Sequence, residues 1–358
     1  MLLILIQSQT IGLVISAYHA SLALHPSVLF PPSAQLAVHM LANIAKTLGR
    51  ARHSDLLFSH AVLRRTYSKP VPREIKTRPV PRLADTHDID LASLSTPAIL
   101  GGVMKSRPAG AAAADLMKAL REGEERLVDV ELGRYDSPES FDRVTMRLGQ
   151  YLDWLDMLGS PDSIGKNKVD GRQLYLAQWR GADEIQSLSA VIAPHPVLHK
   201  LLDKNRIDVY QTSFFIGPNE AVTTLHHDPY MNCFQLAATS NSAGHGKHFL
   251  LLPPTISDIL KPKPSSLTRQ IQRNTSHLNF SLHHTPGGAP QVHVDQMEDA
   301  DADLISSAAL TCVLKEGETL FIPRRWWHRV ENVALLPDEQ GKTSDGWTAG
   351  VAWWFLYS

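Results

Sequence analysis

Length, composition and charge place the chain among ordinary globular proteins. Its 358 residues are 43% hydrophobic and 20% charged, with a net charge of −1 at pH 7. This length suffices for one large core and a smaller helical unit, and the balanced charge predicts no direct nucleic-acid binding. The two cysteines, Cys233 and Cys312, form no CxxC pair. A disulfide framework is therefore not expected, and a reducing compartment is favoured.

The N-terminal 24 residues are apolar enough to be compared with a signal peptide. They lack the basic segment with which such peptides begin, and the polar residues 7–10 interrupt the apolar run well short of a membrane span. Apolar residues recur every three or four positions over residues 33–67, which predicts helices. We therefore expect a helical N-terminal region over residues 1–68, no membrane association, and a nuclear and/or cytoplasmic location.

A proline-rich basic segment follows over residues 69–84. Four prolines and five basic residues fall within fifteen positions there. Such a composition is typical of an extended, solvated linker, and we expect a separate domain over residues 85–358. The alternative is a nuclear-localisation or partner-binding patch made by the basic residues Arg73, Lys76, Arg78 and Arg82.

The domain begins with mixed elements and continues with strands. A short strand is predicted within residues 97–104, a helix over 114–123, a strand over 126–135, and an amphipathic helix over 137–155 that opens with the helix-start signal Ser-Pro-Glu. Short strands separated by turn residues follow, which favours a sandwich or barrel over βαβ units. The predicted strands are residues 173–178, 209–216, 232–238, 247–253, 309–314, 319–323 and 349–357.

A polar stretch over residues 255–305 is expected to be an insertion between strands. It ends in an acidic run that forms either a solvated loop or a surface for a basic substrate tail. The acidic residues are Glu298, Asp299, Asp301 and Asp303.

The stretch LHHDPYMN, residues 225–232, concentrates polar side chains in apolar surroundings. On a strand, residues i and i+2 point to the same face, so His226 and Asp228 share a face and His227 points away. One imidazole and one carboxylate are two thirds of the 2-His-1-carboxylate triad that holds Fe(II). An isolated HxD is more often a polar strand end, so the metal hypothesis needs a third ligand. His328, in GETLFIPRRWWHRVEN, is the candidate, and its alternative is a packed core histidine.

An iron of this type requires an acid co-substrate, and a buried carboxylate requires a cation. Lys247 opens a very apolar strand and is either such an anchor or an edge residue whose ammonium group reaches solvent. Thr223 can add a hydroxyl, Tyr175 a phenol, and Asn232 an amide if the strand stays regular past Pro229. Each of these three, taken alone, is an ordinary strand residue.

Several motifs in sequence resemble a Jumonji-C domain. They are HxDPxxN, a lysine-led strand after it, GExLFIPxxWWH, and a terminal VAWWF. The order of PAILGGVM, VELGRY, LYLAQ, IGP, NTS and GETLFIP is most similar to the group of Jumonji domain-containing protein 5, also called lysine-specific demethylase 8. The resemblance covers about residues 80–358.

The resemblance implies an α+β domain built on a double-stranded β-helix, a cupin-like jelly roll, over about residues 172–358, with flanking helices. It implies Fe(II) and the co-substrate 2-oxoglutarate, and oxidation of a protein side chain in a histone or another basic protein. Carried over residue by residue, it implies two sets of site residues. The iron ligands are His226, Asp228 and His328, and the 2-oxoglutarate contacts are Lys247, Thr223, Asn232 and Tyr175.

The same residues leave the reaction open. We favour C-hydroxylation of arginine or lysine, because no chromatin-reading module is visible, and keep N-methyl-lysine demethylation as a second hypothesis. A catalytically inactive cupin-like binding module and a zinc hydrolase on a similar barrel are two further hypotheses. Two departures from the group bear on the site: Phe215 and Ile216 stand where animal members have a tryptophan before GP, and about six extra residues precede Lys247.

Overall fold

The computed structural model of the chain describes residues 72–84, 89–101, 110–133, 141–158, 172–241, 244–261, 274–283, 291–295, 297–335 and 346–358. All of them belong to one compact unit, Pro70–Ser358. The helical region expected over residues 1–68 lies outside the described residues. Within the described part of the chain, no helix combines the length and the apolar character needed to cross a membrane.

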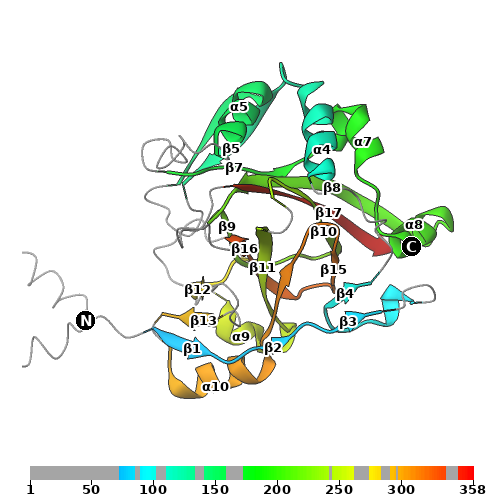
Figure 1. Cartoon of the computed structure of the whole chain (residues 1–358). Helices are drawn as coiled ribbons and strands as arrows, with labels where there is room; N and C mark the ends of the chain where they lie inside the picture. Colours follow the sequence, from blue (N-terminus) through cyan, green and yellow to red (C-terminus); the bar gives the residue numbers. More distant parts are fainter. Residues whose placement is uncertain are drawn as a thin grey trace, which may run out of the picture. The chain divides into compact units, whose positions relative to one another are not determined.

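Two sheets face each other and form a jelly roll (Figure 1). The nine-stranded sheet has the order β3-β4-β15-β10-β17-β8-β7-β5-β6, and the five-stranded sheet has the order β2-β14-β11-β16-β9. The predicted α+β jelly-roll class is therefore confirmed, and each of the seven short strands predicted from the sequence is present. Those are β7 (Leu174–Trp179), β8 (Ile207–Pro218), β10 (Met231–Thr239), β11 (His245–Leu252), β14 (Leu310–Leu314), β15 (Thr319–Ile322) and β17 (Trp347–Tyr357).

Alternation along the strands fills the space between the two sheets. In β11, Phe249 and Leu251 belong to the cluster between the sheets, whereas Leu250 and Leu252 belong to a cluster on the opposite face. Successive strand residues point to opposite faces, so a strand buried on both faces is apolar throughout. Two strands of the five-stranded sheet matter most for the site, β9 (Val222–His227) and β16 (Trp327–Ala334).

A helical layer covers the outer face of the large sheet (Figure 1). It contains α4 (Ala111–Arg121), α5 (Leu148–Leu158) and α7 (Gln186–Val191). The helix predicted over residues 137–155 is wrong over residues 142–147, because Asp142–Arg147 forms strand β6 and pairs antiparallel with β5 (Leu127–Leu132), and residues 137–140 lie outside the described residues. Val144 and Met146 alternate with polar residues and pack against the core, so a period of two prevails over the helical signals.

A third layer covers the outer face of the five-stranded sheet. It is built from the polar stretch expected to be an insertion, which contains α9 (Ser257–Leu260), β12 (Phe280–His283), β13 (Gln291–Val294) and α10 (Asp299–Ala308). The acidic run is not a solvated loop. Asp299 and Asp301 lie in the first turn of α10, where negative charge complements the positive end of the helix dipole.

The segment expected to be a solvated linker is extended but lies against the domain. Its three short strands are β1 (Arg73–Ile75), β2 (Arg78–Pro79) and β3 (Arg82–Leu83). They pair with β13, β14 and β4 (Ala98–Leu100) respectively. Arg73 also forms an ion pair with Asp299. Prolines suit such edge strands, because an edge strand need not donate every backbone N–H to a neighbour.

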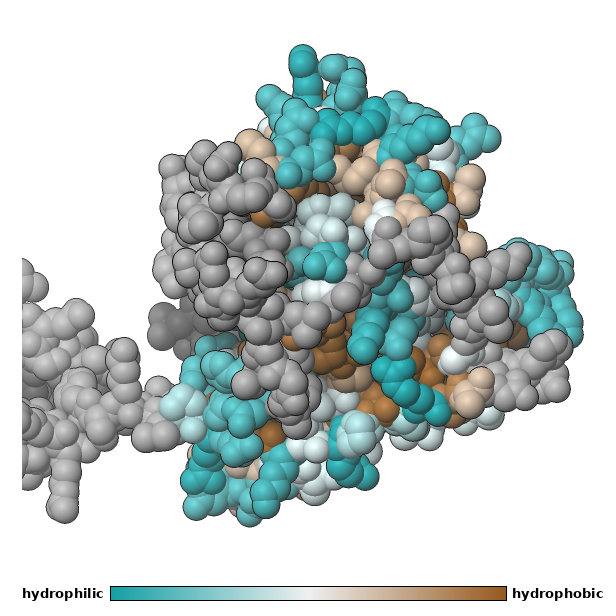
Figure 2. All heavy atoms as spheres, in the orientation of Figure 1, coloured by the Kyte–Doolittle hydropathy of each residue, from teal (hydrophilic) through white to brown (hydrophobic). Residues whose placement is uncertain are grey.

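Short helical turns complete the described fold. They are η1 (Leu91–Ser93), α6 (Gly181–Glu184), α8 (Pro196–Asp203) and η3 (Pro254–Ile256). On the face shown in Figure 2, hydrophilic side chains cover the helical layer and the third layer, and hydrophobic side chains are concentrated between them.

Candidate active site

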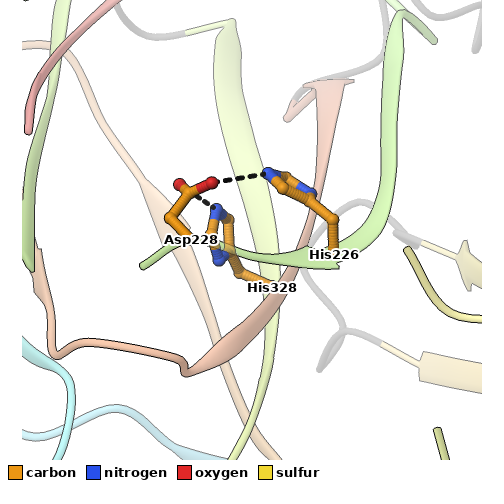
Figure 3. Close-up of side chains that lie close together, drawn as sticks. All are labelled: His226, Asp228 and His328. Atoms are coloured by element: carbon orange, nitrogen blue, oxygen red, sulfur yellow. Dashed lines mark ion pairs between the residues drawn. The ribbon is translucent and has the colours of Figure 1, made fainter. Parts of the chain in front are cut away.

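The pairing of β9 with β16 brings two histidines and an aspartate together at one end of the jelly roll. His328 on β16 lies directly opposite His226 on β9, and the two imidazole centroids are 4.2 Å apart. Asp228 follows the last residue of β9 and turns toward both rings (Figure 3). One ligand atom from each residue lies within 4.8 Å of the others, so the three side chains are able to hold a metal ion.

Backbone carbonyls fix which imidazole nitrogens face the centre of the cluster. Nδ1 of His226 lies 2.8 Å from the carbonyl oxygen of Thr224, and Nδ1 of His328 lies 3.1 Å from that of Trp326. A carbonyl only accepts hydrogen bonds, so each Nδ1 carries the proton and each Nε2 presents a lone pair. This arrangement is typical of metal-binding histidines, whose other nitrogen donates to a fixed acceptor.

Asp228 completes the donor set. Its Oδ1 lies 4.0 Å from Nε2 of His226, and its Oδ2 lies 3.6 Å from Nε2 of His328. Burial, and then the neighbouring His226, lower the pKa of His328 to about 4, which keeps that imidazole neutral near pH 7. Two imidazoles and one carboxylate suit a divalent transition-metal ion with open coordination positions.

His227 does not join this cluster. Its ring makes an edge contact with Trp327 at 4.6 Å, on the other face of the β9–β16 pair. Burial lowers the pKa of His227. The alternation predicted for His226, His227 and Asp228 matches this arrangement.

A narrow cavity on one side of the three residues contains three of the four predicted co-substrate contacts. Tyr175, Thr223 and Asn232 line it together with His226 and His328. Tyr175 and Thr223 hydrogen-bond through their side chains, and burial raises the pKa of the Tyr175 phenol. Asn232 lies on β10 and not on the strand of His226, because β9 ends at His227.

The amide of Asn232 supports the idea that this cavity receives a polar ligand. Its side chain is buried, and its Oδ1 has no hydrogen-bond partner within the described residues. The free volume of the cavity is about 20 Å³, room for about one water molecule. A larger ligand therefore requires side chains of the cavity to move.

Lys247 is fully buried and points between the two sheets, so it is not an edge residue that reaches solvent. Its Nζ lies 5.8 Å from the ring centroids of Tyr175 and Phe234, both of which line the narrow cavity. It donates a 2.6 Å hydrogen bond to Oδ1 of Asn332. Burial lowers the pKa of Lys247 to about 7. No carboxylate forms an ion pair with it in the described part of the chain, so its amino group is able to receive an acid.

A second cavity, of about 250 Å³, opens beside His226 and Asp228. Its wall is mainly polar, and Phe215, the position of one departure from the Jumonji group, lines both cavities. The wall also contains Glu131, Arg143, Gln178, Asn274 and Thr275.

Comparison with known proteins shows the family of the chain. The family described as Cupin-like domain matches residues 86–357. The chain belongs to the cupin-like domain family. Its similarity to individual relatives is lower. It is 27% identical over 209 residues to "Lysine-specific demethylase JMJ30" of Arabidopsis thaliana, a match that covers 52% of this chain and 43% of that protein.

Two Dictyostelium discoideum relatives of the cupin-like domain carry the Jumonji-C name. "JmjC domain-containing protein D" is 25% identical over 218 residues, covering 58% of this chain and 42% of the relative. "JmjC domain-containing protein E" is 28% identical over 159 residues, covering 40% and 42% respectively. The chain thus spans about two fifths of the length of the relatives it matches.

Some polar residues of this cupin-like site were not predicted as site residues. Trp354 donates its indole N–H to Oδ2 of Asp228 at 2.9 Å, and Asn332 holds Lys247. Asn332 is four residues after His328 on the same strand, so period-two alternation alone would have placed it on the same face. Trp354 lies within VAWWF, but no local pattern shows which of two adjacent tryptophans turns inward. Glu131 had no signal beyond its position in a predicted strand, and Arg143 was predicted to lie in a helix.

Proposed function

We propose that the chain is an Fe(II)- and 2-oxoglutarate-dependent oxygenase that hydroxylates a basic side chain of a protein. The observation that carries this proposal is the donor set itself. Two imidazoles with carbonyl-bound Nδ1 atoms and one carboxylate converge within 4.8 Å, and two cavities adjoin them. Such a 2-His-1-carboxylate set is typical of non-haem Fe(II) oxygenases, which keep open positions for co-substrate and oxygen.

The site residues form two sets, one for the metal and one for the co-substrate. Nε2 of His226 and His328 and a carboxylate oxygen of Asp228 would hold the iron. When bound, Fe(II) with 2-oxoglutarate and oxygen supplies hydroxylation of a C–H bond, with 2-oxoglutarate converted to succinate and carbon dioxide. Beside the narrow cavity, Lys247 would exchange Asn332 for a carboxylate of 2-oxoglutarate. The hydroxyls and the amide of Tyr175, Thr223 and Asn232 would bind the same co-substrate.

The wider cavity supports a basic side chain as substrate. Glu131 contributes a carboxylate, while Gln178 and Asn274 contribute amides and Phe215 the aromatic ring. Methylated ammonium groups are usually held by several aromatic rings, whereas guanidinium and ammonium groups require hydrogen-bond acceptors. The polar lining therefore favours C-hydroxylation of arginine or lysine. Demethylation of N-methyl-lysine is the second candidate, because two relatives of Arabidopsis thaliana are named lysine-specific demethylases.

Three finer assignments belong to the same proposal. The order of the sequence motifs supports membership of the Jumonji domain-containing protein 5 group. A histone or another basic protein is the proposed substrate, because the cavity offers a carboxylate to a cation. A nuclear and/or cytoplasmic location is proposed from the cysteine usage, because the two cysteines form no CxxC pair and predict no disulfide framework.

A single-turnover assay tests the proposed reaction. The full chain is incubated anaerobically with Fe(II) and 2-oxoglutarate and then exposed to oxygen, and succinate is measured. Succinate is expected from the wild type and not from Asp228→Ala, while the two proteins retain the same circular dichroism spectrum. With basic peptides added, mass spectrometry separates hydroxylation, which adds one oxygen atom, from demethylation, which releases formaldehyde. Equal succinate from Asp228→Ala would refute the metal assignment.

A further inference from the structure

The wider cavity already contains a cation of the chain itself, the guanidinium group of Arg143. Arg143 on β6 lies directly opposite Glu131 on β5, and its Nη2 lies 3.3 Å from Oε1 of Glu131. The central carbon of this guanidinium group, Cζ, lies 5.9 Å from the ring centroid of Phe141, two residues earlier in the chain. A carboxylate and an aromatic face together are what a guanidinium group binds best.

The two partners of this ion pair differ in how firmly they are held. The Glu131 side chain is only 15% exposed, whereas that of Arg143 is 61% exposed. Burial raises the pKa of the Glu131 carboxyl although Arg143 acts in the opposite direction. Glu131 is thus a fixed part of the cavity wall. Arg143 contacts it from the solvent side, and an exposed ion pair of this kind is weak and readily exchanged.

The position of Glu131 connects this ion pair to the proposed reaction centre. Glu131 lies opposite Tyr175 on β7 as well as opposite Arg143 on β6. Tyr175 hydrogen-bonds Thr223, and both line the narrow cavity beside His226. A cation bound to Glu131 is therefore one strand away from the wall of the proposed co-substrate site.

We propose that Arg143 is a competing cation that occupies the place of the substrate's cation and is displaced from Glu131 when a guanidinium side chain binds. The proposal rests on the proposed oxygenase function. A guanidinium group replaces the lost ion pair, whereas an uncharged side chain of the same shape does not. Displacing Arg143 therefore costs free energy for every ligand that binds beside Glu131, and only a cationic ligand offsets this cost by pairing with Glu131. Without Arg143, the cavity would bind cations more tightly.

Arg147 provides a matched control on the same strand. Its side chain is also 61% exposed, and it also pairs with a carboxylate, Glu125, at 3.5 Å. It is not among the residues that line the wider cavity. If the Arg143–Glu131 pair is merely an ordinary cross-strand ion pair, which stabilises many sheets, substitutions at the two arginines should have the same effect on ligand binding.

The experiment measures binding to the full chain without turnover. The probe is the peptide acetyl-Gly-Arg-Gly-amide, with its citrulline analogue as the uncharged control, titrated by calorimetry at low ionic strength. Arg143→Ala should bind the arginine peptide about three- to fivefold more tightly than the wild type, the range expected for loss of an exposed competing ion pair. Arg143→Lys and Arg147→Ala should bind as the wild type does. Glu131→Gln should bind about tenfold more weakly.

Each other outcome contradicts the proposal. Equal or weaker binding by Arg143→Ala, equal tightening by Arg147→Ala, or no binding by any variant would show that Arg143 does not hold the place of a substrate cation. The succinate assay separates this result from the proposed reaction. Tighter binding by Arg143→Ala without succinate formation would contradict the proposed oxygenase function and support the cation site. Succinate formation with unchanged affinity in Arg143→Ala would support the oxygenase function and contradict the proposed role of Arg143.

Discussion

The indole N–H of Trp354 donates a 2.9 Å hydrogen bond to Oδ2 of Asp228, the carboxylate oxygen that lies 3.6 Å from Nε2 of His328. Trp354 is on β17 and lies opposite Asn232 on β10, so the last strand of the domain orients a carboxylate that follows β9. A carboxylate held by a fixed donor keeps one oxygen directed at the metal position. Such supporting hydrogen bonds contribute strongly to metal affinity.

Replacement of this tryptophan should weaken metal binding more than it weakens the fold. Trp354→Phe keeps the aromatic ring between the sheets but removes the donor, and we expect about 10- to 100-fold lower affinity for Fe(II). Anaerobic titration with Fe(II) measures it. The neighbouring Trp353 packs on the opposite face, in the cluster beneath the helical layer, so Trp353→Phe is the control. Equal affinity in the two variants would contradict the role of the hydrogen bond.

The adjacent histidines of β9 should respond differently to the same substitution. His226→Ala should abolish Fe(II) binding, because one of the three donors is lost. His227→Ala should bind Fe(II) as the wild type does but unfold more easily, by about 1 kcal/mol, because its edge contact with Trp327 is lost. Metal titration and denaturant unfolding measure the two effects. Loss of iron from His227→Ala alone would mean that the strand register is wrong.

Local patterns predicted the part of the site that lies on one short segment. The alternation of His226, His227 and Asp228 requires only the period of a strand. In the same way, the apolar run around Leu250 indicates a strand that is buried on both faces. His328 could be named only as a candidate, because its approach to His226 depends on the pairing of β9 with β16. Tertiary pairing of this kind has no signature in either strand alone.

The errors arose where packing prevailed over local composition. Residues 142–147 follow a helix-start signal but pair over their whole length with β5, which places Val144 against the core. The proline-rich segment was expected to be solvated, but its short strands pair at sheet edges, where proline is tolerated. Trp354 contacts Asp228 from far along the chain, a contact that the sequence pattern around either residue does not contain.

Substitution of Lys247 should separate co-substrate binding from metal binding. If Lys247 pairs with a carboxylate of 2-oxoglutarate, its removal leaves a buried charge without a partner, at a cost of about 3–5 kcal/mol. Lys247→Ala should therefore raise the dissociation constant of 2-oxoglutarate at least about a hundredfold while Fe(II) affinity changes little. Lys247→Arg should recover little, because a planar fork does not replace a compact ammonium group. The exposed Lys315→Ala is the control. Unchanged 2-oxoglutarate affinity in Lys247→Ala would place the anchor elsewhere.

The pH dependence of stability should report the burial of the same lysine. Burial lowers the pKa of Lys247 to about 7, from an ordinary value of 10.5. Above about pH 7 the unfolded chain therefore holds a proton that the folded chain has released, so raising the pH favours the folded state. Burial raises the pKa of the Cys233 thiol from its ordinary 9.0. Above about pH 9 the unfolded chain therefore loses a proton that the folded chain keeps, so raising the pH there favours the unfolded state. The useful window is thus about pH 7 to 8.5.

In this window the free energy of unfolding of the wild type, measured with urea, should rise with pH relative to that of Lys247→Met. The methionine variant has a similar length and no titrating group, so every other ionisable group cancels in the difference between the two proteins. Saturating 2-oxoglutarate with Fe(II) under anaerobic conditions should remove the dependence, because a lysine paired with a carboxylate stays protonated in the folded state. Parallel stability curves for the two proteins without ligand would show that Lys247 keeps its charge in the folded chain over this pH range.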